Sequence, residues 1–186
     1  GNAGPTASTI GAPGNTPWVT TVAAYSHNLS FDEKGISFTG GETTLAELTG
    51  RSITKGFTGN VVQAKDYDQA NAKCIEPFAE NTFTADQIVV CERGLNARVR
   101  KGIIVRDAGA GGMILINLQG EADTVNDDNH VLPAIHLNDV DGKALTDWLA
   151  SGSGHQATIA ASVAGTDDEL GDIAGSFTSR GTDLPY

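Results

Sequence analysis

The densest group of metal-ligating side chains in the sequence is an acidic run over residues 121–129, which reads EADTVNDDN. Its Asp123, Asp127 and Asp128 carry carboxylate oxygens, the ligands that Ca²⁺ prefers. Their spacing does not follow the EF-hand order of alternating acidic residues, a glycine and a closing glutamate. Two interpretations therefore stay open, a solvated loop of an acidic protein and a weak calcium site. Apart from that calcium, we expect no cofactor.

The histidines are the next candidates, because an imidazole can act as the base that activates a nucleophile. None of the four, His27, His130, His136 and His155, lies in a recognisable nucleophile context, and no Gly-x-Ser-x-Gly element occurs. The chain is therefore expected to have no catalytic activity of its own. His130 precedes an apolar run at 132–135, and we expect it to hydrogen-bond between loop and strand rather than to contact a ligand.

Two cysteines, Cys74 and Cys91, are too few for a structural zinc site and form no Cys-x-x-Cys pair. They are either joined in a disulfide or are two separate buried thiols. A disulfide would close a loop of about 16 residues and stabilise the fold by roughly 3 kcal/mol. The sequence favours this alternative, which suits an oxidising compartment.

Composition excludes several functional classes. The chain has 186 residues and a net charge of −11. Such a charge repels phosphate backbones and anionic membrane surfaces, so we expect neither nucleic acid nor membrane as a partner. No apolar run approaches the ~18 residues of a membrane span.

Hydrophobic patterning predicts the elements that must position these side chains. Extended runs at 59–62, 87–91 and 112–117 predict strands, and an edge hairpin is expected between 25 and 48. Helices are expected at 96–108 and 139–150, with Val99 and Val140 among the residues facing the core and Asn138 or Asp139 as the cap of the second. A further extended run is expected at 17–22. The order indicates a mixed sheet with helices packed on it.

The two ends of the chain resemble the subtilisin-like serine proteases. The similarity lies in Gly1-Asn2-Ala3-Gly4, in Thr9-Ile10-Gly11-Ala12-Pro13 and in Trp18 to Ala24, and again in Ser176-Phe177-Thr178-Ser179-Arg180-Gly181. Simple members of that family need only a short turn between these segments. Residues 25–175 therefore form a domain-sized insertion.

The insertion closely resembles the protease-associated (PA) domain from about residue 50 to residue 164. The ordered blocks that carry the resemblance are Cys91-Glu92-Arg93-Gly94, Lys101, Asp107 to Asn117, His130 to Ile135 and Asp141 to Leu145. The resemblance implies an α+β fold, with a mixed or sandwich-like β-sheet and two or more flanking helices. It divides the chain into a protease segment (1–27), an edge hairpin (28–50), the PA domain (51–164) and a return segment (165–186).

The resemblance also assigns roles that only the intact protease could use. Asn2 would be the side-chain donor of the oxyanion hole, and Gly1, Ala3 and Gly11 would line the primary specificity pocket. The serine, histidine and aspartate of the triad have no counterpart here. In the isolated chain, Asn2 is expected to be only a residue of a frayed end.

The expected function is that of a non-catalytic PA domain of a secreted subtilisin-like endopeptidase, modulating access of protein or peptide substrates or mediating protein–protein contacts. The alternatives are an independent peptide-binding module and an oligomerisation domain, for which a homodimer is the simplest form.

Overall fold

The computed structural model describes residues 1–31, 33–120 and 124–181 of the chain. The chain folds into two compact units. The first combines residues 1–30 with the chain from residue 164 onward, and the second spans residues 31–163. No helix within the described residues is long and apolar enough to cross a membrane.

The second unit is built on a seven-stranded mixed sheet with the order β3-β2-β8-β4-β5-β6-β7. Strands β4 to β7 are mutually parallel, whereas β2 pairs antiparallel with both β3 and β8, and β8 pairs antiparallel with β4. The α+β class expected from the sequence is confirmed. The strands are β2 (Lys34–Thr39), β3 (Leu48–Gly50), β4 (Phe57–Gln63), β5 (Gln87–Glu92), β6 (Gly112–Ile116), β7 (Ala134–Leu137) and β8 (Gln156–Ile159).

The two edges of this sheet meet. Directly after β3, the N–H of Arg51 donates to the carbonyl of His136 in β7 over 3.0 Å, and the N–H of His136 donates back to Arg51 over 2.9 Å. Gly50 permits this approach, because a Cβ at that position would lie 2.6 Å from the same carbonyl oxygen. The pairing satisfies backbone groups that an open edge would leave exposed.

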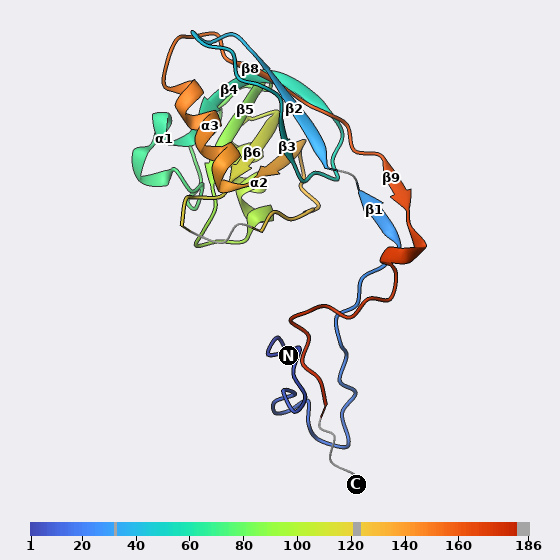
Figure 1. Cartoon of the computed structure of the whole chain (residues 1–186). Helices are drawn as coiled ribbons and strands as arrows, with labels where there is room; N and C mark the ends of the chain where they lie inside the picture. The colour runs from blue at the N-terminus through green and yellow to red at the C-terminus, as the bar shows by residue number, and fades with distance from the viewer. Residues whose placement is uncertain (32, 121–123, 182–186) are drawn as a thin grey trace. The chain divides into compact units, whose positions relative to one another are not determined.

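Helices cover both faces of the sheet, as its strands require. Successive apolar residues of a strand point to opposite faces, so Ile88 and Val90 join one buried cluster and Val89 and Cys91 the other. Helix α3 packs on the first face and α2 on the second, and Figure 1 shows α3 in front of the strands. The helices are α1 (Ala64–Tyr67), α2 (Arg98–Asp107) and α3 (Asp139–Leu149), with a 3-10 turn at Gln69–Asn71.

Two details of the helical predictions are wrong. Val99 and Val140, expected in the core, are 37% and 71% exposed. The buried side of α2 instead includes Lys101, and that of α3 includes Gly142. The expected cap of α3 is confirmed at Asn138, whose side chain accepts a hydrogen bond from the N–H of Asp141 over 2.8 Å.

In the first unit, the two ends of the chain run antiparallel. The N–H of Gly175 donates to the carbonyl of Ala24 over 2.9 Å, and Tyr25 bridges to Ala174. Strand β1 (Leu29–Phe31) pairs with β9 (Ala164–Thr166), and a 3-10 turn follows at Asp168–Leu170. The strand expected at 17–22 is absent, because no described segment pairs with that run.

The cysteine pair is a disulfide, as the sequence favoured. Cys74 and Cys91 are joined with their Cα atoms 5.7 Å apart. The bond ties the loop after the 3-10 turn to the buried strand β5, and both cysteines are fully buried.

Candidate functional site

A groove lies at the carboxyl ends of the parallel strands. Strand β4 leads into α1, while β5 ends at Glu92 and β6 is followed by Asn117. Strand β7 leads through Asn138 into α3. In sheets with parallel strands, loops and helix starts meet at this edge and commonly form the ligand site.

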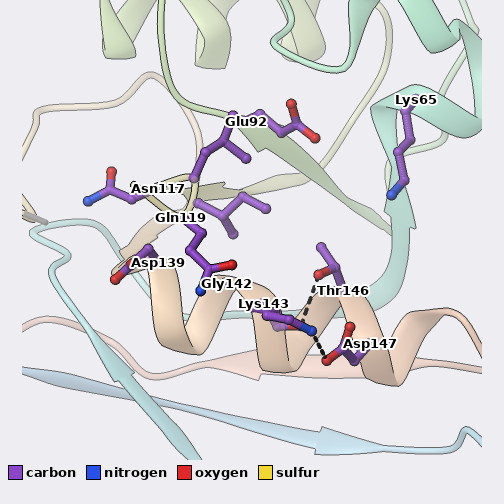
Figure 2. Close-up of a pocket in the computed structure, with 11 residues that line it drawn as sticks. Lys65, Glu92, Asn117, Gln119, Asp139, Gly142, Lys143, Thr146 and Asp147 are labelled. Carbon is purple, nitrogen blue, oxygen red and sulfur yellow. Dashed lines mark hydrogen bonds and ion pairs between the residues drawn. The ribbon is translucent and has the colours of Figure 1, made fainter. Parts of the chain in front are cut away.

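The groove holds a cavity of about 320 Å³, with a second lobe of about 350 Å³ continuing along α3. Both volumes fall at the lower end of the range for small-molecule sites. We call this feature the α1–α3 groove (Figure 2). Its polar lining consists of Lys65 from α1, Glu92, Asn117 and Gln119 from the strand ends, and Asp139, Lys143, Thr146 and Asp147 from α3.

Charges in the groove are distributed unevenly. The Nζ atom of Lys143 lies 2.5 Å from a carboxylate oxygen of Asp147, so these two charges largely neutralise each other. The side chains of Lys65, Glu92 and Asp139, by contrast, have no hydrogen-bond or ion-pair partner among the described residues. One positive and two negative side chains of the groove are therefore without such a partner, Lys65 on α1, Glu92 at the end of β5 and Asp139 on α3.

The floor is rigid and polar at Asn117, which is 1% exposed. Its Oδ1 atom accepts from Arg93 over 3.2 Å and from Nε2 of His136 over 2.8 Å. Its Nδ2 atom donates to the carbonyl of Thr124 over 3.1 Å. Because three bonds fix its amide, Asn117 has little freedom to turn toward a ligand.

His136 is neutral at physiological pH. Burial, followed by the charges of Arg93 and Arg98, lowers its pKa from 6.5 to about 4. Its Nδ1 atom accepts from the backbone N–H of Asn126 over 3.0 Å, so the single ring proton must reside on Nε2. The imidazole is thus a fixed structural member of the network beneath the groove.

In the described residues, the two candidate calcium ligands of the acidic loop pair with arginines. Asp123, the third candidate, lies outside the described residues. Asp128 pairs with Arg98, and Asp127 lies 3.8 Å from Arg51. Burial raises the pKa of Asp127, whereas the hydrogen bond and charge of Arg98 outweigh burial and lower the pKa of Asp128. Within the described part of the chain, no three His, Cys, Asp or Glu side chains are grouped to hold a metal ion.

In the described part of the chain, none of His130, His136 and His155 is hydrogen-bonded to a serine, threonine or cysteine side chain that could act as a nucleophile. His130 was expected to hydrogen-bond between loop and strand, but its Nδ1 atom is buried without a hydrogen-bond partner among the described residues. The histidine with such contacts is His136. Among the described residues, Nε2 of His155 hydrogen-bonds to the carbonyl oxygens of Trp148 and Ser151.

The predicted protease residues all lie in the first unit. The carbonyl of Gly1 accepts from the N–H of Ser179 over 3.0 Å, and the N–H of Ala3 donates to Oγ of Ser179 over 3.1 Å. Asn2 is exposed, and so is Gly11. The backbone around Asn2 is therefore tied to the returning segment 176–181 rather than frayed.

Sequence reasoning missed the role of Lys101, although the residue was noted in the PA-like pattern. Its side chain is completely buried, and its Nζ atom donates to the carbonyls of Lys73 and Gly94 and to Oδ1 of Asn96. Burial lowers its pKa to about 8. This lysine fixes the loop that follows β5, beside the disulfide. A lysine within an apolar helical pattern is the only signal the sequence offers.

Comparison with known proteins decides the family. The sequence model of the PA domain family matches residues 57–145, from the first residue of β4 into α3. The chain contains a PA domain. The match includes the groove residues Lys65, Glu92, Asn117 and Gln119, and ends within α3.

The segments around the PA domain are also matched. The chain is 30% identical over 187 residues to the subtilisin-like protease SBT5.4 and 30% identical over 194 residues to SBT1.7, both from Arabidopsis thaliana. Each alignment covers 97% of this chain but only 24% of the relative. The chain thus spans about a quarter of the proteases it matches.

The zinc aminopeptidase BSAP from Bacillus subtilis aligns with a TM-score of 0.45 and 17% identity, over 85% of this chain and 33% of that one.

Proposed function

We propose that this chain is the PA-domain region of an extracellular subtilisin-like serine endopeptidase, and that the PA domain takes no part in bond cleavage but modulates the access of protein substrates. The observation that supports this most directly is the pairing of the two protease-like ends into one unit. The hydrogen bond between Ala24 and Gly175 closes the base of the insertion, as an insertion into a protease scaffold requires.

Within the whole protease, we propose that Asn2 donates to the oxyanion and that Gly1, Ala3 and Gly11 line the specificity pocket. The hydrogen bonds that join segment 1–4 to segment 177–179 support this proposal. Large apolar side chains of the same unit remain exposed, among them Trp18 at 81% and Val22 at 81%. Further polypeptide of the protease would cover them, since such surface rarely stays open to water in a complete domain.

The test compares two substrate classes in the full-length protease. Replacing residues 28–172 by a short linker should change the rate of cleavage of a folded protein by about tenfold or more relative to that of a short peptide. Activity on the short peptide shows that the shortened protease is folded. An unchanged ratio of the two rates would contradict the gating role. The isolated chain should cleave neither substrate.

A second candidate function is supported by the α1–α3 groove, whose free charges suit a bound polypeptide. In that case the PA domain would bind peptides without the protease. Sedimentation at several concentrations separates this from the remaining alternative, a homodimer, because only dimerisation makes the sedimentation coefficient rise with concentration.

A further inference from the structure

We infer that Ser179 is a positioning residue of the proposed protease, one that holds Asn2 in the orientation needed to donate to the oxyanion. This inference rests on the oxyanion role proposed for Asn2 and names the residue that would maintain it. It is carried by two hydrogen bonds that Ser179 forms with the two neighbours of Asn2 in the sequence.

The two bonds reach the peptide groups on either side of Asn2. The N–H of Ser179 donates over 3.0 Å to the carbonyl of Gly1, which belongs to the peptide group before the Cα atom of Asn2. The N–H of Ala3, in the peptide group after that atom, donates over 3.1 Å to Oγ of Ser179. Only two backbone dihedrals lie between these planar groups. Holding both groups therefore fixes the direction in which the side chain of Asn2 leaves the backbone.

The anchor is buried and closely packed. Ser179 is 8% exposed, whereas Asn2 is an exposed residue. A Cβ atom at Gly1 would lie 2.6 Å from Oγ of Ser179, and a Cβ atom at Gly4 would lie 1.8 Å from the carbonyl oxygen of Thr178. The two backbones are therefore in direct contact, and they leave the side chain of Asn2 on the outside.

One of the contacts between the two segments depends on a side chain. The N–H of Gly4 donates to the carbonyl of Phe177 over 2.9 Å, and the bond between Ser179 and Gly1 also joins backbone groups. A substitution leaves both of these bonds in place. Ser179→Ala removes only the Oγ atom that accepts from Ala3. The expected result is a less rigid Asn2 in a segment that stays attached.

The size of the effect follows from the demands of the oxyanion. Its donors must lie about 2.7 to 3.1 Å from the developing charge, and a misplacement of about 1 Å can reduce the rate about 100-fold. Ser179→Ala releases one of the two peptide groups of Asn2 and leaves the amide itself. We therefore expect kcat to fall about tenfold, less than the roughly 100- to 1,000-fold expected for loss of the donor in Asn2→Ala.

Thr178 supplies a matched control. It is 4% exposed, and its Oγ1 atom accepts from the N–H of Ala24 over 3.0 Å. This neighbouring hydroxyl is thus equally buried, but it bonds to the base of the insertion rather than to a neighbour of Asn2. Thr178→Val removes the hydroxyl and keeps the shape of the side chain.

The experiment measures kcat and KM of the full-length protease on a short peptide, with the concentration of folded enzyme determined by active-site titration. Ser179→Ala should lower kcat about tenfold and leave KM within about twofold, because the contact is needed in the transition state. Thr178→Val should leave kcat within about twofold. If Ser179→Ala yields no folded enzyme, Ser179→Cys replaces it with the same expectations, because sulfur is the weaker hydrogen-bond acceptor.

A double variant tests whether Ser179 acts through Asn2. In the Asn2→Ala background, Ser179→Ala should change kcat by less than about twofold, because no amide remains to be misplaced. Independent effects of the two residues would multiply instead.

Three results would overturn the inference: a normal kcat for Ser179→Ala, an equal fall for Thr178→Val, or effects of Ser179→Ala and Asn2→Ala that multiply. The proposed function fails separately. A normal kcat for Asn2→Ala would remove the oxyanion role and this inference with it. A reduced kcat for Asn2→Ala beside a normal kcat for Ser179→Ala would reject the positioning role alone.

Discussion

Nε2 of His136 donates a 2.8 Å hydrogen bond to Oδ1 of Asn117 beneath the floor of the α1–α3 groove. The same histidine carries the backbone bridge to Arg51 that joins the two edges of the sheet. One residue thus links closure of the sheet to the position of a groove side chain. Protonation of His136 should therefore affect both the closure of the sheet and the position of Asn117.

Acid should destabilise the fold through His136. Its folded pKa of about 4 lies below the unfolded value of 6.5, so the unfolded chain takes up a proton first as the pH falls. The contribution of neutral His136 to the free energy of unfolding is fully present above pH 6.5 and is lost progressively as the pH falls toward 4. The loss between pH 7 and pH 4.5 should be about 2 to 3 kcal/mol.

Urea unfolding of the wild type and of His136→Phe at both pH values measures this loss. The variant should be less stable than the wild type at pH 7, because Asn117 loses a partner. The difference between the two proteins should shrink at pH 4.5. If it is the same at both pH values, His136 does not titrate as argued.

Lys101→Met should destabilise the chain by about 3 kcal/mol or more, because three buried acceptors would lose their donor. Thermal or denaturant unfolding measures the change. Arg100→Met is the matched control, since Arg100 is exposed on the same helix. Equal stability of the two variants would show that the ammonium contacts contribute nothing net.

Removing the disulfide, by Cys74→Ser together with Cys91→Ser, should lower the free energy of unfolding by roughly 3 kcal/mol. The bond closes a short loop with a sequence separation of 17 residues and restricts the unfolded chain. Unfolding with and without a reductant provides the same comparison on the unaltered sequence. A reductant should therefore leave the melting temperature of the double variant unchanged.

In the full-length protease, Asn2→Ala should reduce kcat about 100- to 1,000-fold, as loss of an oxyanion donor does in enzymes of this kind. Protein and peptide substrates should be affected equally, because the oxyanion forms with both. Thr6→Ala, which alters an exposed side chain in the same segment, is the control. A normal kcat for Asn2→Ala would remove the proposed role.

Much of the fold followed from local patterns. The uniformly apolar run that became β6 could only be a strand covered on both faces, and the Asn138 cap defined the start of α3. The burial of Lys101 could not be predicted, because its acceptors come from loops that only the fold brings together. For the same reason, the exposure of Val99 and Val140 depends on where each helix meets the sheet.

The α1–α3 groove could not be predicted from the sequence. Lys65, Glu92, Gln119 and Asp139 lie 20 to 27 positions apart along the chain and belong to no common motif. They meet because parallel strands place their carboxyl ends at one edge. By contrast, the acidic loop had a recognisable composition, yet Asp127 and Asp128 face arginines from other elements.

The hydrogen bond between Ala24 and Gly175 also bears on how the chain folds. An unstructured loop of about 150 residues between two such points would cost about 2 kcal/mol more closure entropy than a turn of about ten residues. Asn28 is bonded to Asp167 and Asp168 as well, over 2.8 Å in each case. Once residues 31–163 have folded, closing the chain between Ala24 and Gly175 should therefore cost little more entropy than closing a short turn. The length of the insertion is then nearly irrelevant to the folding of the two ends.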